Sequence, residues 1–238
     1  IHKDVSPSLR KLYSDLSMMR YVLRLYGLPL AIDGARSGSW SGGTWKDGRI
    51  HVLAKVMAWS MVFYHPLEHV AWVHWTMPKL LPSSQPATGA TSNQKGNKRY
   101  KWWQDGDRLS AWSCRFWLVF IAADFVSSVL KNQELNGRKR ELLYDTISGK
   151  SNSTDDDADT DTNANAEAKK EEVDQIENSM FMNRLQILRC MFFTPPCLSW
   201  SQDNFATDPL FPENIVNGLS WAEAVTCMYQ SLCSLHKS

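Results

Sequence analysis

The sequence lacks the marks of several large protein classes. Its five cysteines are odd in number and include no C-x-x-C pair, which argues against a disulfide framework or a cysteine zinc site and favours a reducing compartment. No stretch alternates polar and apolar residues between turn signals, as strands do. The Gly- and Ser-rich loop at 37–48, which we expect to be flexible, has neither a phosphate-binding nor a dinucleotide-binding pattern. These absences predict an all-α protein without a nucleotide-binding loop.

Net charge is also nearly absent, at +1 for 238 residues, but this balance hides two regions of opposite sign. Residues 150–178 hold ten acidic residues and three lysines, whereas the other 209 positions carry 23 basic and 15 acidic residues. The basic remainder suits an anionic membrane surface or a nucleic acid. The low-complexity segment 146–178 buries too little apolar surface to offset its chain entropy, so we expect a disordered acidic insertion between regions 1–145 and 179–238.

Four apolar blocks predict the helices. They lie at 9–26, at 50–77, at 111–130 and, in two pieces, at 180–200 and 215–235. The predicted fold is all-α, with an amphipathic N-terminal helix followed by a bundle of membrane-associated or membrane-spanning helices.

The first block is the clearest amphipathic helix in the chain. At about 100° per residue its apolar side chains share one arc, with arginines on the opposite side. A helix lying on a soluble core and an interfacial membrane helix both fit this pattern. The apolar arc consists of Leu9, Leu12, Leu16, Met19, Leu23 and Tyr26.

The third block has the length of a transmembrane helix and contains an unbroken apolar run at 116–123. Arg115 lies near one end, within reach of an interface, whereas Asp124 lies deep in the block. A carboxylate near the bilayer centre costs about 2.5–3.5 kcal/mol, and this cost falls if the side chain faces other helices. A membrane span and a buried helix of a soluble bundle remain the two interpretations.

The second block contains His65-Pro66-Leu67-Glu68-His69, which matches the H-x-x-E-H pattern of zinc hydrolases. Two imidazoles one helical turn apart would bind zinc, and the glutamate would activate water. Proline removes a helical hydrogen bond, so we expect Pro66 to divide the block into two helices and turn His65 away from His69. We therefore predict no catalytic residue, no metal site and no cofactor. By the same reasoning the helix at 180–200 should end before Pro195.

The connector at 78–108 is basic and rich in tryptophan and tyrosine. Such a segment fits single-stranded nucleic acid, a juxtamembrane loop or an ordinary solvated loop. Because no recognisable nucleic-acid-binding module surrounds it, we predict no nucleic-acid partner.

Three sequence stretches, taken in order, resemble a known family. The first runs from Arg20 through Arg24-Leu25-Tyr26-Gly27, the second is Tyr64-His65-Pro66-Leu67-Glu68-His69-Val70-Ala71-Trp72, and the third is Trp112-Ser113-Cys114-Arg115-Phe116-Trp117. In order and spacing they are similar to the peroxin-eleven family of peroxisomal membrane proteins, and most resemble its gamma or C-type branch. The motif residues that carry the resemblance include Tyr64, Pro66, Leu67, Glu68, His69, Trp112, Ser113, Arg115 and Trp117.

The resemblance implies a non-enzymatic protein of the peroxisomal membrane. Members of this family remodel and elongate that membrane before fission, self-associate, and act with dynamin-related GTPases. The second interpretation of this chain is a metabolite channel, which Asp124 and Arg115 would line. The third is a zinc hydrolase. On the first interpretation the N-terminal helix would expand one leaflet, with Arg20 and Arg24 meeting anionic lipid phosphates. The membrane-inserting residues would be Leu9, Leu12, Leu16, Met19 and Leu23.

Overall fold

The computed structural model describes residues 11, 12, 19, 24, 26–77, 105–151, 159–205 and 207–235. Within these ranges every regular element is helical and there is no strand, which confirms the all-α prediction. The elements are α2 (Gly27–Ser37), the 3₁₀ turn η1 (Ser39–Ser41), α3 (Gly48–Thr76), α4 (Gly106–Ser151), α5 (Asp159–Trp200) and α6 (Glu213–Leu235).

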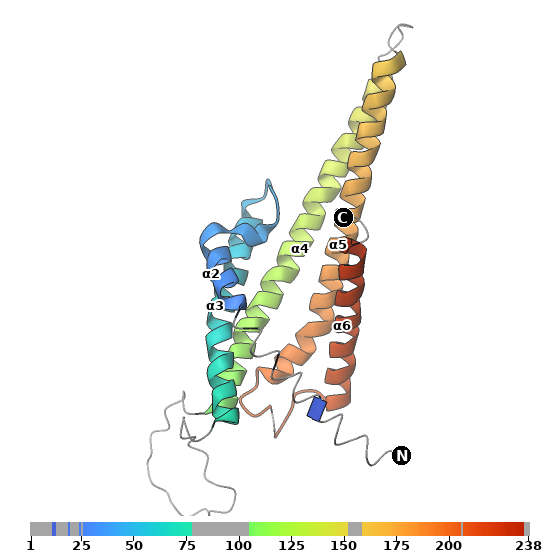
Figure 1. The fold of residues 1–238 in the computed structure, drawn as a ribbon. Coiled ribbons are helices and arrows are strands. Elements are labelled where there is room, and N and C mark those ends of the chain that lie inside the picture. Colours follow the sequence, from blue (N-terminus) through green and yellow to red (C-terminus); the bar gives the residue numbers. More distant parts are fainter. Residues whose placement is uncertain are drawn as a thin grey trace, which may run out of the picture.

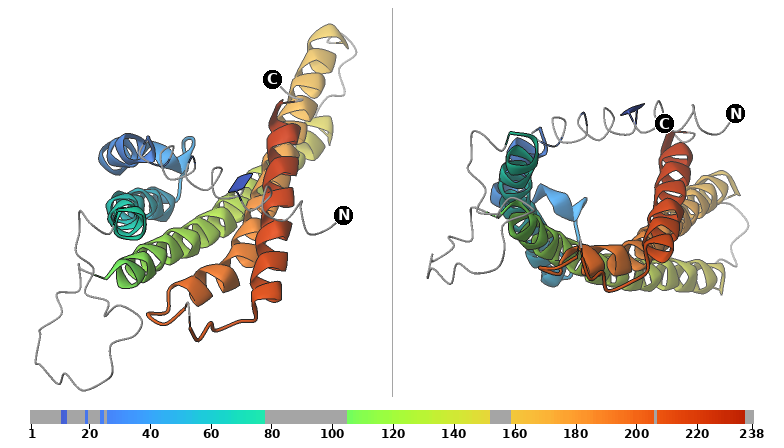
Figure 2. Two further views of the ribbon diagram at one scale, coloured as in Figure 1. Left: turned by 60° about the horizontal axis from the view of Figure 1, so that its bottom comes forward. Right: turned by 90° about the horizontal axis from the view of Figure 1, so that it is seen from below.

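The two longest helices, α4 and α5, form an antiparallel hairpin that organises the molecule (Figure 1). Helix α3, with α2 against it, packs along the first half of α4, and α6 packs along the second half of α5. The tip of the hairpin projects beyond the other helices. Seen end-on, α3, α4, α5 and α6 follow one another in a curved layer (Figure 2). The helices are therefore packed side by side along an arc, and each of them keeps a face that no other described helix covers.

Three prolines lie inside helices, and the prediction that they divide or end them is wrong. Helix α3 runs through Pro66 from Gly48 to Thr76, and α5 runs through Pro195 and Pro196 to Trp200. A proline ring removes one backbone donor and opposes the preceding turn. Packing around the prolines offsets the cost of this lost hydrogen bond. His65 and Glu68, on either side of Pro66, are buried, and Pro196 is itself fully buried. Tertiary packing thus overrides the local signal.

The acidic segment also differs from its predicted disorder. Helix α4 continues to Ser151 and α5 begins at Asp159, so only 152–158 of this segment lie outside the described residues. Ile176 and Met180 of α5 pack on Leu135 of α4. The Lys139 ammonium forms an ion pair with Glu177 and holds the pKa of that carboxyl below its usual range. Helix α4 thus supplies the apolar contacts that the acidic segment could not make as an isolated helix.

The loop between α2 and α3 is fixed to α4, although we expected it to be flexible. The Glu134 carboxylate accepts hydrogen bonds from the backbone N–H groups of Lys46 and Asp47, at 2.9 and 3.2 Å. The Trp45 ring lies close to both Lys131 and Arg138, whose cationic groups are 5.5 and 5.7 Å from its centroid. This contact secures the start of α3 against α4.

Candidate functional site

The three motif stretches meet at one place in the fold, which we call the motif junction: Arg24, Tyr64, Glu68 and Trp117. The Arg24 guanidinium forms an ion pair with the Glu68 carboxylate. Its central carbon is 5.9 Å from the Tyr64 ring centroid and 5.8 Å from that of Trp117, and the two rings are 5.4 Å apart. The side chains of Arg24 and Glu68 are 23% and 11% exposed. The junction therefore joins the end of the N-terminal segment to α3 and α4.

Arg115 makes a second link between distant segments. Its guanidinium donates to the Ser201 carbonyl oxygen at 3.1 Å and to the Asp203 carboxylate at 2.8 Å, just beyond the end of α5. The same group lies over the Trp112 ring, 4.7 Å from its centroid. Buried Ser113 donates its hydroxyl to the Ser110 carbonyl oxygen at 2.7 Å. The third motif thus connects α4 to the segment between α5 and α6.

The remaining motif residues of α3 border an apolar groove against α4. Pro66 and Leu67 line it with Trp112 and Phe116, and its volume is about 610 Å³. The Phe63 and Phe116 rings are stacked at 5.2 Å on the same side. The second and third motifs are therefore structural neighbours at this groove.

The histidines of the H-x-x-E-H sequence have different surroundings. His69 Nδ1 donates to the backbone carbonyl oxygen of His65 at 2.6 Å. The His65 ring packs so closely on Gly27 that a Cβ atom there would lie 2.7 Å from it. Glu68, the residue that would activate water, binds Arg24 instead. Among the residues that the structure describes, no three His, Cys, Asp or Glu side chains are grouped as metal ligands.

The predicted membrane-inserting helix lies largely outside the described residues. Leu9, Leu16, Arg20 and Leu23 fall there, so their predicted roles stay predictions. Leu12 and Met19 are described, and they are 54% and 63% exposed. Arg24, predicted to meet a lipid phosphate, is placed by the structure in the motif junction; its lipid contact would require the pair with Glu68 to open.

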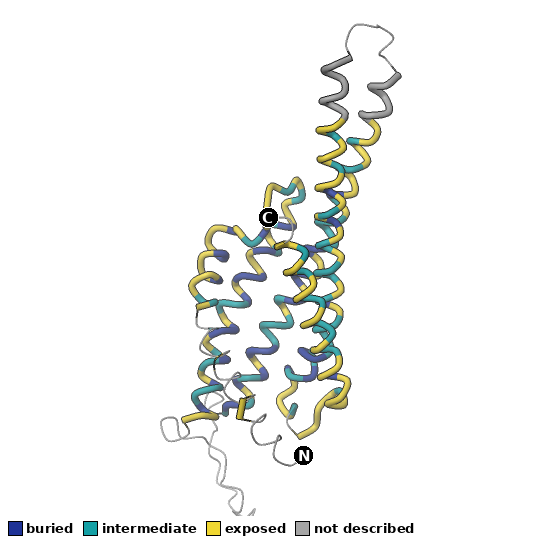
Figure 3. The backbone as a smooth tube through the Cα atoms, turned by 45° about the vertical axis from the view of Figure 1, so that its right-hand side comes forward, coloured by how far each residue is buried: buried dark blue, intermediate teal, exposed yellow. Residues whose placement is uncertain are grey.

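Large apolar side chains also form exposed stripes along three helices of the bundle. Exposed positions recur along the described parts of these helices, as Figure 3 shows. On α4, Trp112, Val119 and Val126 are seven residues apart and share one face. Exposed apolar side chains at the same helical spacing follow two other helices: Val52, Val56, Trp59, Phe63 and Val70 on α3, and Trp221, Val225, Met228, Leu232 and Leu235 on α6. We call these the exposed apolar stripes.

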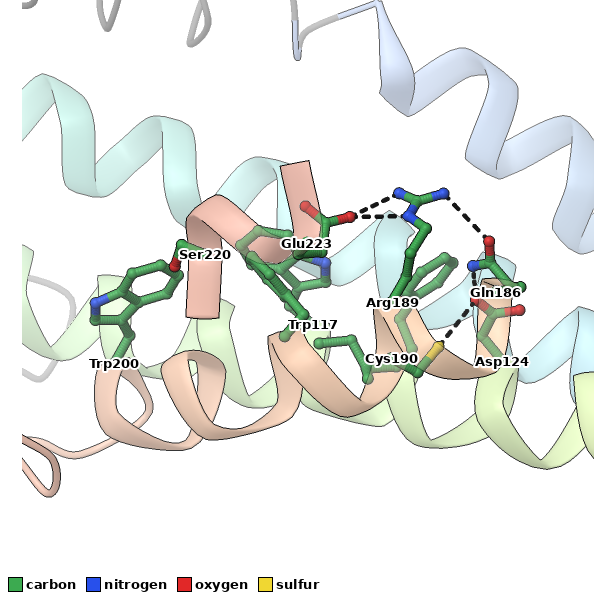
Figure 4. A pocket seen from close by; sticks show the side chains of 11 residues that line it. Trp117, Asp124, Gln186, Arg189, Cys190, Trp200, Ser220 and Glu223 are labelled. Atoms are coloured by element: carbon green, nitrogen blue, oxygen red, sulfur yellow. Dashed lines mark hydrogen bonds and ion pairs between the residues drawn. The ribbon is translucent and has the colours of Figure 1, made fainter. Parts of the chain in front are cut away.

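A cavity of about 380 Å³ lies between α4, α5 and α6 (Figure 4). One end holds a chain of hydrogen bonds. Gln186 donates to Asp124 Oδ2, and Arg189 donates to Gln186 Oε1 at 3.2 Å and twice to Glu223 Oε1, at 2.8 and 2.9 Å. The Cys190 thiol also points at Asp124 Oδ2, at 3.5 Å. Aromatic rings line the rest of the cavity: Trp117, Phe120, Phe193 and Trp200.

Sequence reasoning singled out Asp124 but missed its partners. Only Glu223, farther along the same chain of hydrogen bonds, had a signal in the sequence, because it is the one charged residue in the final apolar block. Asp124 and Arg115 do not line one passage. Nine residues apart, they lie about 180° around α4 from one another, and each binds a different segment.

Comparison of the chain with protein-family models, curated proteins and solved structures finds no match. The fold defines the class: an all-α helical bundle with one long apolar helix. Within the described residues, α4 is the one helix long and apolar enough to do so by length and composition, over Gly106–Tyr144.

Proposed function

We propose that this chain is a peroxisomal membrane protein that remodels and elongates its membrane before fission. The observation that carries the membrane part is the set of exposed apolar stripes beside the apolar stretch of α4. Large exposed apolar patches are rare on soluble monomers and are typical of surfaces that meet lipid or another protein. The peroxisomal part rests on the resemblance of the three motif stretches to the peroxin-eleven family.

The dimensions of α4 support a spanning role. The apolar block 111–130 lies within α4 and covers 20 residues, which at about 1.5 Å per residue is about 30 Å, the thickness of the hydrocarbon core. Asp124 faces α5 rather than lipid, since its carboxylate binds Gln186 and Cys190. This arrangement lowers the cost of carrying a carboxylate within the span.

The motif junction supports a way of coupling the N-terminal helix to the bundle. An amphipathic helix lying in one leaflet expands that leaflet and bends the membrane. Arg24 lies at the end of this helix and binds Glu68 of α3 beside Trp117 of α4. The inserted helix is thereby held at a fixed place beside the spanning helix, so its expansion acts on the membrane next to the bundle. Self-association through the exposed stripes would gather many such helices.

A cell experiment tests both parts of the proposal. Expression of the tagged chain should give longer, more numerous peroxisomes, and the chain should resist carbonate extraction. Val225→Glu with Met228→Glu places two charges in the α6 stripe and should weaken membrane retention and elongation together. The matched control is Gln133→Glu with Asn136→Glu, which adds the same charge at exposed polar positions of α4. Release of the parent chain by carbonate would refute the membrane assignment, and retention on another organelle would refute the peroxisomal one.

A further inference from the structure

Within the part of the chain that the structure describes, the polar end of the α4–α5–α6 cavity carries one carboxylate, Asp124, that forms no ion pair. Arg189 is matched by Glu223, which accepts two of its N–H groups. Asp124 is 8% exposed and receives hydrogen bonds on Oδ2 from the neutral Gln186 amide and Cys190 thiol. Among the described residues no cation lies within ion-pair distance of Asp124.

The next cation along α4, Lys131, interacts electrostatically with Asp124 but forms no ion pair with it. Lys131 is seven residues beyond Asp124, about 10 Å along the helix, and its ammonium lies 5.5 Å from the centroid of the Trp45 ring. A buried carboxylate is costly unless it is paired, so a site of this kind favours a positive group. The negative charge of Asp124 therefore favours a positively charged ligand.

The other end of the cavity fits an apolar body. The Trp117 and Phe193 rings are 4.6 Å apart, and Phe193 and Trp200 are 5.9 Å apart. Aromatic faces attract organic cations as well as apolar groups. A further polar atom, the Ser220 hydroxyl oxygen, is buried at the cavity without a hydrogen-bond partner. The volume of about 380 Å³ falls within the range of small-molecule sites.

We propose that this cavity binds a small amphipathic organic cation. The protonated amine of the ligand donates to the Asp124 carboxylate, and its apolar or aromatic part lies among Trp117, Phe193 and Trp200. A free anion would meet Asp124 and Glu223 and is disfavoured. Ser220 offers a second hydrogen bond to a polar substituent. This site is independent of membrane remodelling, so its failure and the failure of the proposed function are separate results.

Three matched probes test the charge requirement on the full-length protein in detergent. Phenethylamine is the cation, 2-phenylethanol its neutral counterpart and 3-phenylpropionate the anion. Calorimetric titration should give saturable binding of the amine. Its affinity should exceed that of the alcohol by about tenfold or more, because the alcohol cannot form the charge-assisted hydrogen bond to Asp124. The propionate should bind more weakly than the alcohol. Equal affinity for amine and alcohol, or only unsaturable uptake by the micelle, overturns the proposal.

Two variants locate the site. Asp124→Asn should weaken amine binding by about tenfold or more and leave alcohol binding unchanged. The matched control Asp208→Asn removes an exposed carboxylate from the segment between α5 and α6 and should leave both affinities unchanged. Ser220→Leu removes the unpartnered hydroxyl and fills part of the cavity, so both ligands should bind more weakly. Undiminished amine binding by folded Asp124→Asn overturns the proposal; if that variant unfolds, undiminished binding by Ser220→Leu does so.

Discussion

The carboxylate of Glu68 forms an ion pair with the guanidinium of Arg24, 44 residues earlier in the chain. The pair is largely buried, and the Arg24 guanidinium also lies close to the neighbouring rings of Tyr64 and Trp117. Three short motifs that are far apart in the sequence thereby meet at one place in the fold. The three motif stretches therefore bring the N-terminal segment, α3 and α4 together.

A double-mutant cycle should show that Arg24 and Glu68 are coupled. Arg24→Ala leaves the Glu68 carboxylate largely buried without its cation, and Glu68→Ala leaves the guanidinium unpaired, so each should cost about 2–4 kcal/mol of unfolding free energy. The double variant should cost less than the two losses added together, because no unpaired charge is left. Urea titration of the four proteins in detergent measures this coupling. Additive losses would mean that the pair does not form in solution.

The sequence predicted the features that depend on residues close together in the chain, and it failed for those that depend on residues far apart. The all-α fold and the long apolar helix α4 follow from periodicity, which is local information. Pro66 and the acidic segment were misjudged, because their helical state depends on neighbours distant in sequence: α3 is held by α4, and Ile176 packs on Leu135. The partners of Asp124 were beyond reach for the same reason. Gln186 is 62 residues away and lies on a helix whose bounds were themselves mispredicted.

Charge reversal at Arg115 should be rescued by the opposite reversal at Asp203. Arg115→Glu places two carboxylates together where the structure has an ion pair at 2.8 Å, and it also removes the donor to the Ser201 carbonyl oxygen. Both side chains are partly exposed, so the expected loss is about 1 kcal/mol or slightly more. Adding Asp203→Arg should restore part of it. Thermal unfolding of the single and double variants checks this, and no recovery in the double variant would show that the charge pair contributes nothing.

Trp45 should control how firmly the loop before α3 is held. Trp45→Ala removes the ring that Lys131 and Arg138 contact and the indole donor to the Ser41 carbonyl oxygen, at 2.9 Å. The two cation–π contacts and the hydrogen bond together amount to about 2 kcal/mol, so tryptic cleavage after exposed Lys46 should accelerate about tenfold or more. Trp221→Ala is the matched control, because Trp221 is exposed on α6. Unchanged cleavage in Trp45→Ala would mean that Glu134 alone secures the loop.

The N-terminal helix should be the part that deforms the membrane. Replacing Leu16 and Met19 by Glu puts two charges at the centre of its predicted apolar arc, removing burial worth about 1.5–3 kcal/mol per residue and adding repulsion from anionic lipid. A peptide spanning 6–27 should become helical on anionic vesicles, and the double variant should not, because isolated helices of this length are marginal in water. In cells the full-length double variant should keep its membrane association through α4 but lose peroxisome elongation.

Replacing Ser14 and Ser17 by Glu adds the same charge on the opposite face and should leave most of the elongation intact. If the Leu16/Met19 variant elongates peroxisomes as well as the parent does, the N-terminal helix is not what bends the membrane, and the bundle itself must do so.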